Sequence, residues 1–92
     1  MAALDLTRSD RPFGEALTEL VREVEDDLFL TARGLKVSTF AEMLDGVSSG
    51  TLGAAVAGTR EPSPGLMEEC ARFLRVRPEY FREYRARLAH AA

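Results

Sequence analysis

The sequence predicts an all-α protein, a compact bundle of five helices in one domain. Apolar residues recur at the three- and four-residue spacing of amphipathic helices in several separate segments. Proline or glycine residues interrupt the chain between those segments. In the middle, two short helical patterns flank Asp45-Gly46, which is a strong turn signal. A chain of 92 residues has room for one such domain and not for two.

Residues 1–11 are polar and show no sustained periodicity, so we expect a flexible N-terminal arm followed by a domain over residues 12–92. The first helix is predicted to open at Pro12 with Asp10 as its cap. Phe29 to Ala32 extend the predicted helix to Arg33-Gly34. Its buried face follows one helical stripe, formed by Leu17, Leu20, Val21, Val24 and Leu28.

The central stretch, residues 35–58, reads as two helices joined by a tight turn. Ser38 and Thr39 are candidate caps of the first, whose apolar residues are Phe40, Ala41 and Leu44. Ser48 or Ser49 is expected to cap the second, and Gly58 to end it in the left-handed conformation. The apolar stripe of this second helix is Leu52, Ala55 and Val56. Two amphipathic helices about a short turn form the helix-turn-helix pattern.

Two further helices are predicted after a polar, proline-containing loop. Ser63 caps the first of them, which starts at Pro64, and Pro78-Glu79 opens the last. The inward residues of the first are Leu66, Met67, Cys70, Ala71 and Leu74, and the apolar side of the last carries Tyr80, Phe81, Tyr84 and Leu88. The last helix has surplus apolar surface, which fits either a homodimer contact or packing against the first helix.

Residues 33–82 resemble the lambda-repressor-like helix-turn-helix family, the Xre and Cro type of DNA-binding domain. The resemblance rests on these matching pieces, in order: Gly34-Leu35, Phe40-Ala41 with Leu44, Gly46-Val47-Ser48, Thr51-Leu52, Gly58, Arg60-Glu61-Pro62 and Val76 to Phe81. The family usually has Leu directly before Gly, whereas Leu44-Asp45-Gly46 carries one extra residue. The resemblance implies that Phe81 fills the core and that the helix after Ser48 faces DNA.

The predicted recognition helix carries no Arg, Gln or Asn, the usual bidentate readers of base edges. We predict that Ser48, Ser49, Thr51 and Gly53 lie at the major groove and that phosphate contacts come from Lys36, Ser38, Thr39, Thr59 and Arg60. Ala54 and Ala57 add to a smooth surface. Such a surface also suits close packing against another protein helix, so a protein-interaction module is the alternative to a DNA-binding regulator.

The charge is divided along the chain. The net charge is −3, with five basic and ten acidic residues before Arg60 and seven Arg against five Glu from Arg60 onward. An acidic first helix on the far side of a small domain does not forbid phosphate binding, because charge is screened within about 10 Å at physiological salt. Arg8 and Arg11 of the N-terminal arm are secondary DNA candidates, as some relatives reach around the duplex with such an arm; a disordered tail is the other interpretation.

Other functional classes have little support in the sequence. His90 stands alone near the C-terminus, and Cys70, the single cysteine, falls on an apolar helical stripe. We therefore expect no enzyme, metal site or cofactor. We find neither a membrane-length apolar run nor a secretion signal and expect a cytoplasmic protein. The expected partners are double-stranded DNA and a second copy of the chain, with another regulatory protein as the alternative to the second copy.

Overall fold

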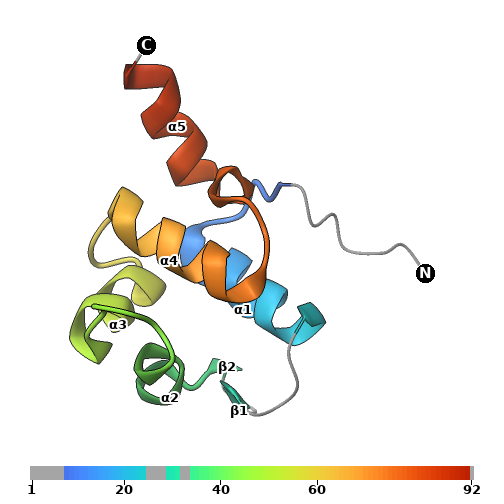
Figure 1. The fold of residues 1–92 in the computed structure, drawn as a ribbon, viewed down its shortest axis with the longest axis vertical. Helices are drawn as coiled ribbons and strands as arrows, with labels where there is room; N and C mark the ends of the chain where they lie inside the picture. Colours follow the sequence, from blue (N-terminus) through green and yellow to red (C-terminus); the bar gives the residue numbers. More distant parts are fainter. Residues whose placement is uncertain (1–7, 25–28, 32–33, 92) are drawn as a thin grey trace.

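The computed structural model describes residues 8–24, 29–31 and 34–91, and it confirms the all-α bundle (Figure 1). α1 and α4 cross the middle of the molecule, α2 and α3 lie at one end, and α5 projects from the other (Figure 1). The described elements, in chain order, are α1 (Phe13–Val24), β1 (Leu30–Thr31), β2 (Gly34–Leu35), α2 (Val37–Glu42), α3 (Ser49–Ala57), α4 (Pro64–Leu74), the 3-10 helix η2 (Pro78–Tyr80) and α5 (Arg82–Ala91).

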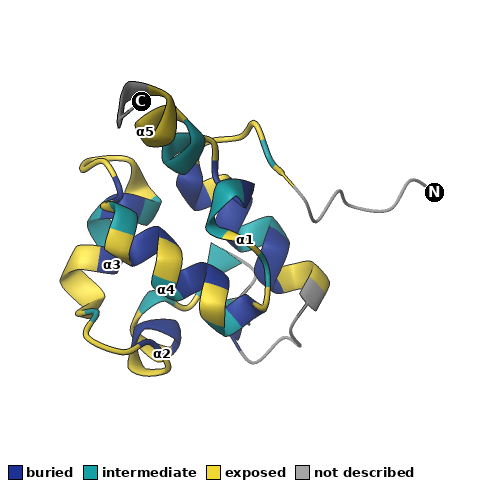
Figure 2. Cartoon of the chain, turned by 45° about the horizontal axis from the view of Figure 1, so that its top comes forward, coloured by how far each residue is buried: buried dark blue, intermediate teal, exposed yellow. Residues whose placement is uncertain are grey.

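One apolar core joins these elements, and Figure 2 shows buried residues along α1 and α4. Phe29, Phe40 and Phe73 meet edge to face, with ring centroids between 5.4 and 6.0 Å apart. Phe81 is fully buried, and its ring lies 4.9 Å from that of Phe13, which confirms the prediction that Phe81 fills the core. Besides Phe13, Phe29, Phe40 and Phe81, the core cluster of described residues contains Ala16, Leu17, Leu20, Val21, Ala41, Leu44, Leu52, Ala55, Leu66, Met67, Cys70, Ala71, Leu74 and Tyr80, and Phe73 packs against it partly buried.

A small β-hairpin replaces the last part of the predicted first helix. Helix α1 is described as far as Val24, and residues 25–28 and 32–33 lie outside the described residues. Leu30–Thr31 pairs antiparallel with Gly34–Leu35, so the prediction of helix through these residues is wrong. Gly34 has φ of 125°, a backbone conformation that most residues avoid, and the Lys36 N–H donates to the Phe29 carbonyl at 2.6 Å. These features turn the chain and direct Phe29 into the core.

The predicted caps of the first two helices are also wrong. Helix α2 begins at Val37, so Ser38 and Thr39 lie within its first turn, and its N-cap Lys36 makes no side-chain capping bond. The reason is that the hairpin ends at Leu35 and delivers the chain to α2 earlier than the serine signal suggests. At α1, the Phe13 N–H donates to Glu83 of α5 at 3.0 Å, and Asp10 pairs instead with Arg85.

The turn between α2 and α3 is longer than the usual helix-turn-helix connection because residues 43–48 all lie between the two helices. Gly46 adopts φ of 74°, which confirms the turn at Asp45-Gly46. Leu44 is buried although α2 has already ended, while Met43 is 51% exposed. The extra residue before Gly46 therefore lengthens the turn, and Leu44 still reaches the core.

The second half of the chain follows the prediction closely. Ser63 caps α4 by accepting from the Leu66 N–H at 3.2 Å, and the five predicted inward residues of α4 are buried. The last helix differs because it is divided: η2 ends at Tyr80, Phe81 is extended, and α5 starts at Arg82. This break lets both Tyr80 and Phe81 enter the core.

The N-terminal segment is described from Arg8 onward and lies beside the start of α5 (Figure 1). The Ser9 N–H donates to the Tyr80 carbonyl at 2.8 Å. Arg85, only 26% exposed, donates to the Ser9 carbonyl at 2.9 Å and to the Asp10 carboxylate at 2.8 Å. Residues 1–7 of the predicted arm lie outside the described residues.

Candidate nucleic-acid interface

Helix α3 has a well-defined start and end. The Ser48 hydroxyl accepts from the Thr51 N–H at 3.1 Å and donates to the Thr51 hydroxyl at 2.9 Å, so of the two predicted candidates, Ser48 and Ser49, the cap is Ser48. Gly58 ends the helix in the left-handed conformation with φ of 83°, also as predicted. Both ends of α3 are therefore fixed by local contacts.

The inner side of α3 is buried and its outer side is small and uncharged. Leu52 and Ala55 are buried, whereas Ser49, Gly50, Thr51 and Ala57 are exposed. The helix contacts α1 and α2. Ser49, Gly50 and Thr51, at the start of the helix, are thus available to a large ligand, and no side chain longer than that of threonine stands on this outer side.

Gly53 is less accessible than the other predicted groove residues. It is half-buried, and a Cβ atom built on it would lie 3.6 Å from the Val37 side chain of α2. That distance is an ordinary van der Waals contact. Gly53 therefore lies beside the packing of α3 against α2, which brings the start of α2 close to α3.

The start of α2 presents Lys36, Ser38 and Thr39, all of which are exposed. Neither hydroxyl is used as a cap, and within the described part of the chain neither forms a hydrogen bond. The structure therefore leaves both hydroxyls and the Lys36 ammonium group accessible on the α2 side of the interface.

The loop after α3 begins with residues that close the helix. The Thr59 N–H and hydroxyl both donate to the Ala54 carbonyl, at 3.0 and 3.2 Å. Thr59 therefore helps to close the end of α3. Arg60 is exposed, and its guanidinium has no ion pair among the described residues. Arg60 is the cation of this loop that remains free to meet a phosphate.

The turn that leads into α3 is held from α4. Glu69 accepts from the Asp45 N–H at 2.8 Å and pairs with Arg72 one turn along its own helix. The hydrogen bond from Arg72, with the Asp45 bond second, lowers the pKa of the Glu69 carboxyl to about 2. Glu69 is consequently ionised at any physiological pH and holds the lengthened turn, a role that sequence spacing did not indicate.

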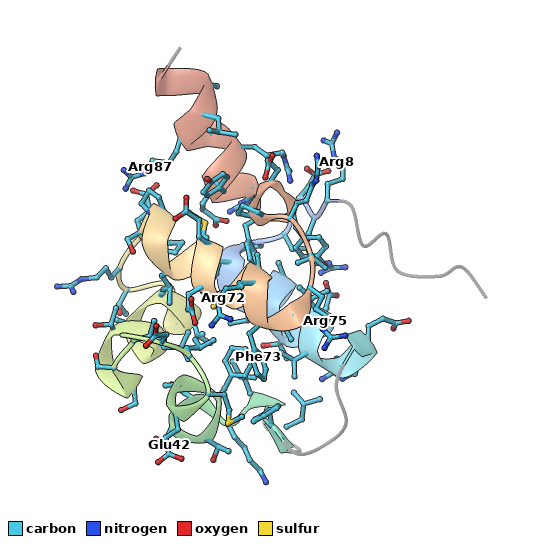
Figure 3. All side chains as sticks on the ribbon, viewed as in Figure 1. Arg8, Glu42, Arg72, Phe73, Arg75 and Arg87 are labelled. Carbon is cyan, nitrogen blue, oxygen red and sulfur yellow. The ribbon has the colours of Figure 1, made fainter. Side chains whose placement is uncertain are left out.

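The charge around α3 is slightly acidic. From residue 36 to residue 61 the chain carries Lys36 and Arg60 against Glu42, Asp45 and Glu61. Figure 3 shows Glu42 at the α2 end of the molecule and Arg8 and Arg87 toward the α5 end. After Arg60, the arginines lie in α4 (Arg72), in the link between α4 and η2 (Arg75 and Arg77) and in α5 (Arg82, Arg85 and Arg87), so little positive charge stands on α2 and α3.

Arg8 and Arg11 of the predicted arm are both engaged in ion pairs. Arg8 lies 3.5 Å from Asp10, and Arg11 lies 3.6 Å from Glu15 and 3.3 Å from Glu19 on α1. These pairs are exposed and individually weak. They nevertheless place both arginines near the start of α1 and not beside α2 and α3.

Other chemistry is not favoured by the described residues. Among them, no group of three or more His, Cys, Asp or Glu side chains is arranged to hold a metal ion. Burial, with the nearby charge of Glu69 second, raises the pKa of the Cys70 thiol to about 12, so it stays protonated. No helix in the described part of the chain has the length and hydrophobicity that crossing a membrane requires.

Comparison with protein-family models identifies a family for this chain. A family model described as helix-turn-helix matches residues 28–81, more than half of the chain. The matched stretch runs from the segment before β1 through Phe81 and includes α2, α3 and α4, whereas α1 and α5 lie outside it. No curated protein and no solved structure matches the chain significantly.

Proposed function

The chain belongs to the helix-turn-helix family of the Xre and lambda-repressor type, and from this membership we propose that it is a cytoplasmic transcriptional regulator that inserts α3 into the major groove of DNA. The family is a DNA-binding one. The observation that carries the proposal is the start of α3, where Ser49, Gly50 and Thr51 are exposed while Leu52 and Ala55 anchor the helix in the core.

The side chains that would contact the major groove in this proposal are all small. Ser49 and Thr51 offer hydroxyl groups to base edges and Gly50 allows close approach, while Ser48 caps the first turn and Gly53 lies one turn further on, where α3 packs against α2. A helix without Arg, Gln or Asn makes no bidentate contact with a base. The regulator accordingly derives much of its selectivity from DNA shape and deformability.

The phosphate contacts come from two sides of α3. Lys36, Ser38 and Thr39 approach the backbone from α2, and Thr59 and Arg60 approach it from the loop after α3. With only two cations in this set, the affinity for DNA depends weakly on salt. A log–log slope of about −2 is expected for a single copy, which is small for a DNA-binding protein.

A titration against random-sequence duplex at several salt concentrations tests the proposal. The affinity is expected to fall with salt, and Arg60→Ala is expected to weaken binding and to reduce the slope by about one. Arg77→Ala is the matched control, because Arg77 is exposed and precedes η2, which packs on α4 and α5. Absence of binding at about 50 mM salt contradicts the proposal.

The acidic balance of residues 36–61 favours a second candidate function, a protein-interaction module that keeps the fold without binding DNA. In that case the small, uncharged outer side of α3 meets a helix of another regulatory protein. The salt titration separates the two functions, because a protein-interaction module shows no affinity for duplex at low salt.

We also propose that the regulator is a homodimer formed through α5. Leu88 is 48% exposed near the projecting end of this helix, and Tyr84, one turn earlier, reaches back to Glu68 of α4 with a hydrogen bond of 2.8 Å. Sedimentation of Leu88→Glu beside the unmodified chain tests this contact. The mass is expected to halve in the variant, whereas equal masses contradict the dimer through α5.

A further inference from the structure

The first turn of α5 holds the start of α1 by contacts that span almost the whole chain. Glu83 accepts from the Phe13 N–H at 3.0 Å and so caps α1 from a helix 70 residues away. Arg85 donates to the carbonyls of Glu79 and Tyr80 and also to Ser9 and Asp10. We name the contacts of Glu83 and Arg85 with residues 9–13 the α5 clasp. The clasp fixes where α1 begins.

The next residue of α1 holds α3. A Cβ atom on Gly14 would lie 2.1 Å from the Val56 carbonyl oxygen, which means that the two backbones are in direct contact. No flexible side chain stands between them to absorb a displacement. A shift of α1 at Gly14 therefore moves α3 at Val56 or opens a gap in the packing between them.

Helices α5 and α3 face each other across an open groove of about 550 Å³. Arg82 and Glu83 line one side of this groove, and residues 55–58 line the other. A packed connection from α5 to α3 runs through Phe13 and Gly14, because Glu83 accepts from the Phe13 N–H and Gly14 touches the Val56 carbonyl. Ring packing between Phe13 and Phe81, at 4.9 Å, ties the same point to the segment that precedes α5.

We propose that α5 is a regulatory latch for the recognition helix: when the clasp is closed, α3 is held in one orientation, and when it opens, α3 loosens while the rest of the bundle stays folded. A partner that withdraws Glu83 from Phe13 loosens α3, and one that holds α5 in place tightens it. The effect of the latch on DNA affinity rests on the function proposed above, whereas its effect on the order of α3 does not.

Amide hydrogen exchange of the full chain without DNA tests the latch. In Glu83→Ala, the amides of α3 and of the first turn of α1 are expected to exchange about fivefold faster, the factor that corresponds to a lost helix cap. The amides of α4 are expected to keep their rates. Glu83→Gln retains an oxygen acceptor for the Phe13 N–H and is expected to behave as the unmodified chain does.

Two further variants make the result decisive. Arg87→Ala changes an exposed residue of the same helix that has no hydrogen bond or ion pair among the described residues, and it is expected to leave α3 unchanged. If Glu83→Ala fails to fold, Glu83→Asp takes its place. It shortens the side chain by one carbon, and amide exchange in α3 is expected to accelerate less, about twofold. Faster exchange in α5 with unchanged α3, or an equal rise in α3 and α4, overturns the proposal. If the unmodified chain does not bind DNA while the exchange pattern is as expected, only the proposed function is rejected.

Discussion

At the scale of single residues, two backbone contacts determine how α3 is seated. Gly14 touches the carbonyl of Val56, and the Asp45 N–H is held by Glu69. The first fixes the second half of α3 against α1, and the second fixes the turn that leads into α3. Neither contact involves a residue that would meet DNA, so altering either one acts on the proposed interface only through the position of α3.

Gly14→Ala is expected to destabilise the protein by about 2 to 3 kcal/mol, because the added methyl group overlaps a backbone carbonyl that has no room to move. Urea unfolding measures the loss. Gly65→Ala on α4 is the matched control, since a Cβ atom there meets nothing within 4 Å, and it is expected to be neutral or stabilising by up to about 1 kcal/mol. Equal stabilities for the two variants would show that α1 and α3 are not in contact at this point.

Glu69 gives the stability a defined pH dependence. Its pKa is about 2 in the folded protein and has its ordinary value near 4.5 in the unfolded chain, so the folded state binds fewer protons in this range. Its contribution is therefore complete above about pH 5 and is lost as the pH falls toward 2. Thermal unfolding is expected to show that Glu69→Gln is less stable by about 1 kcal/mol at neutral pH. The difference should vanish in acid, and a constant difference would contradict the assignment.

At the scale of elements, the two serines at the start of α3 have different roles. Ser48 and Ser49 are adjacent and both exposed, but only the Ser48 side chain bonds the Thr51 N–H. The two serines therefore form a natural pair of test positions, one for the stability of the helix and one for contact with DNA.

Ser48→Ala is expected to lower the free energy of unfolding by about 1 kcal/mol through loss of the cap, whereas Ser49→Ala should leave it within about 0.5 kcal/mol of the unmodified value. Denaturant unfolding checks both values. Ser49→Ala is expected to weaken DNA binding because a base-edge hydroxyl is removed. A large loss of stability in Ser49→Ala alone would reverse the assignment of the cap.

The sequence predicts those elements whose signals are local. Ser48, Gly58 and Ser63 bond or turn within four residues of themselves, and all three predictions are confirmed. The hairpin at Leu30–Leu35 could not be predicted, because its apolar residues also fit a helix and because its strands are two residues long. The start of α1 is capped by Glu83, and the turn at Asp45 is held by Glu69. Both carboxylates are distant in sequence from the residues that they bind, so no local signal predicts these contacts.

At the scale of the whole molecule, two observations favour different partners. The exposed position of α3 favours DNA, whereas the low positive charge around α3 favours another protein. The family fold exposes the start of α3 at one end of the bundle, while α5, with Arg82, Arg85 and Arg87, projects from the opposite end (Figure 1). Arg82 donates a hydrogen bond to the Asp10 carbonyl, and Arg85 donates to the Ser9 carbonyl and the Asp10 carboxylate, so both are already hydrogen-bonded within the chain. The candidate site residues were predicted from the family pattern, and their contacts with DNA remain a prediction that exposure supports.

The central claim is that α3 meets DNA through its first turn. It can be tested by NMR: the isotopically labelled chain is titrated with a duplex selected from a randomised pool, and the shifts of its backbone amide resonances are measured. We expect the largest shifts at Ser49, Gly50 and Thr51, with smaller ones at residues 36–39 and at Arg60. Shifts confined to the arginines of α4 and α5, with the start of α3 unmoved, would contradict the account.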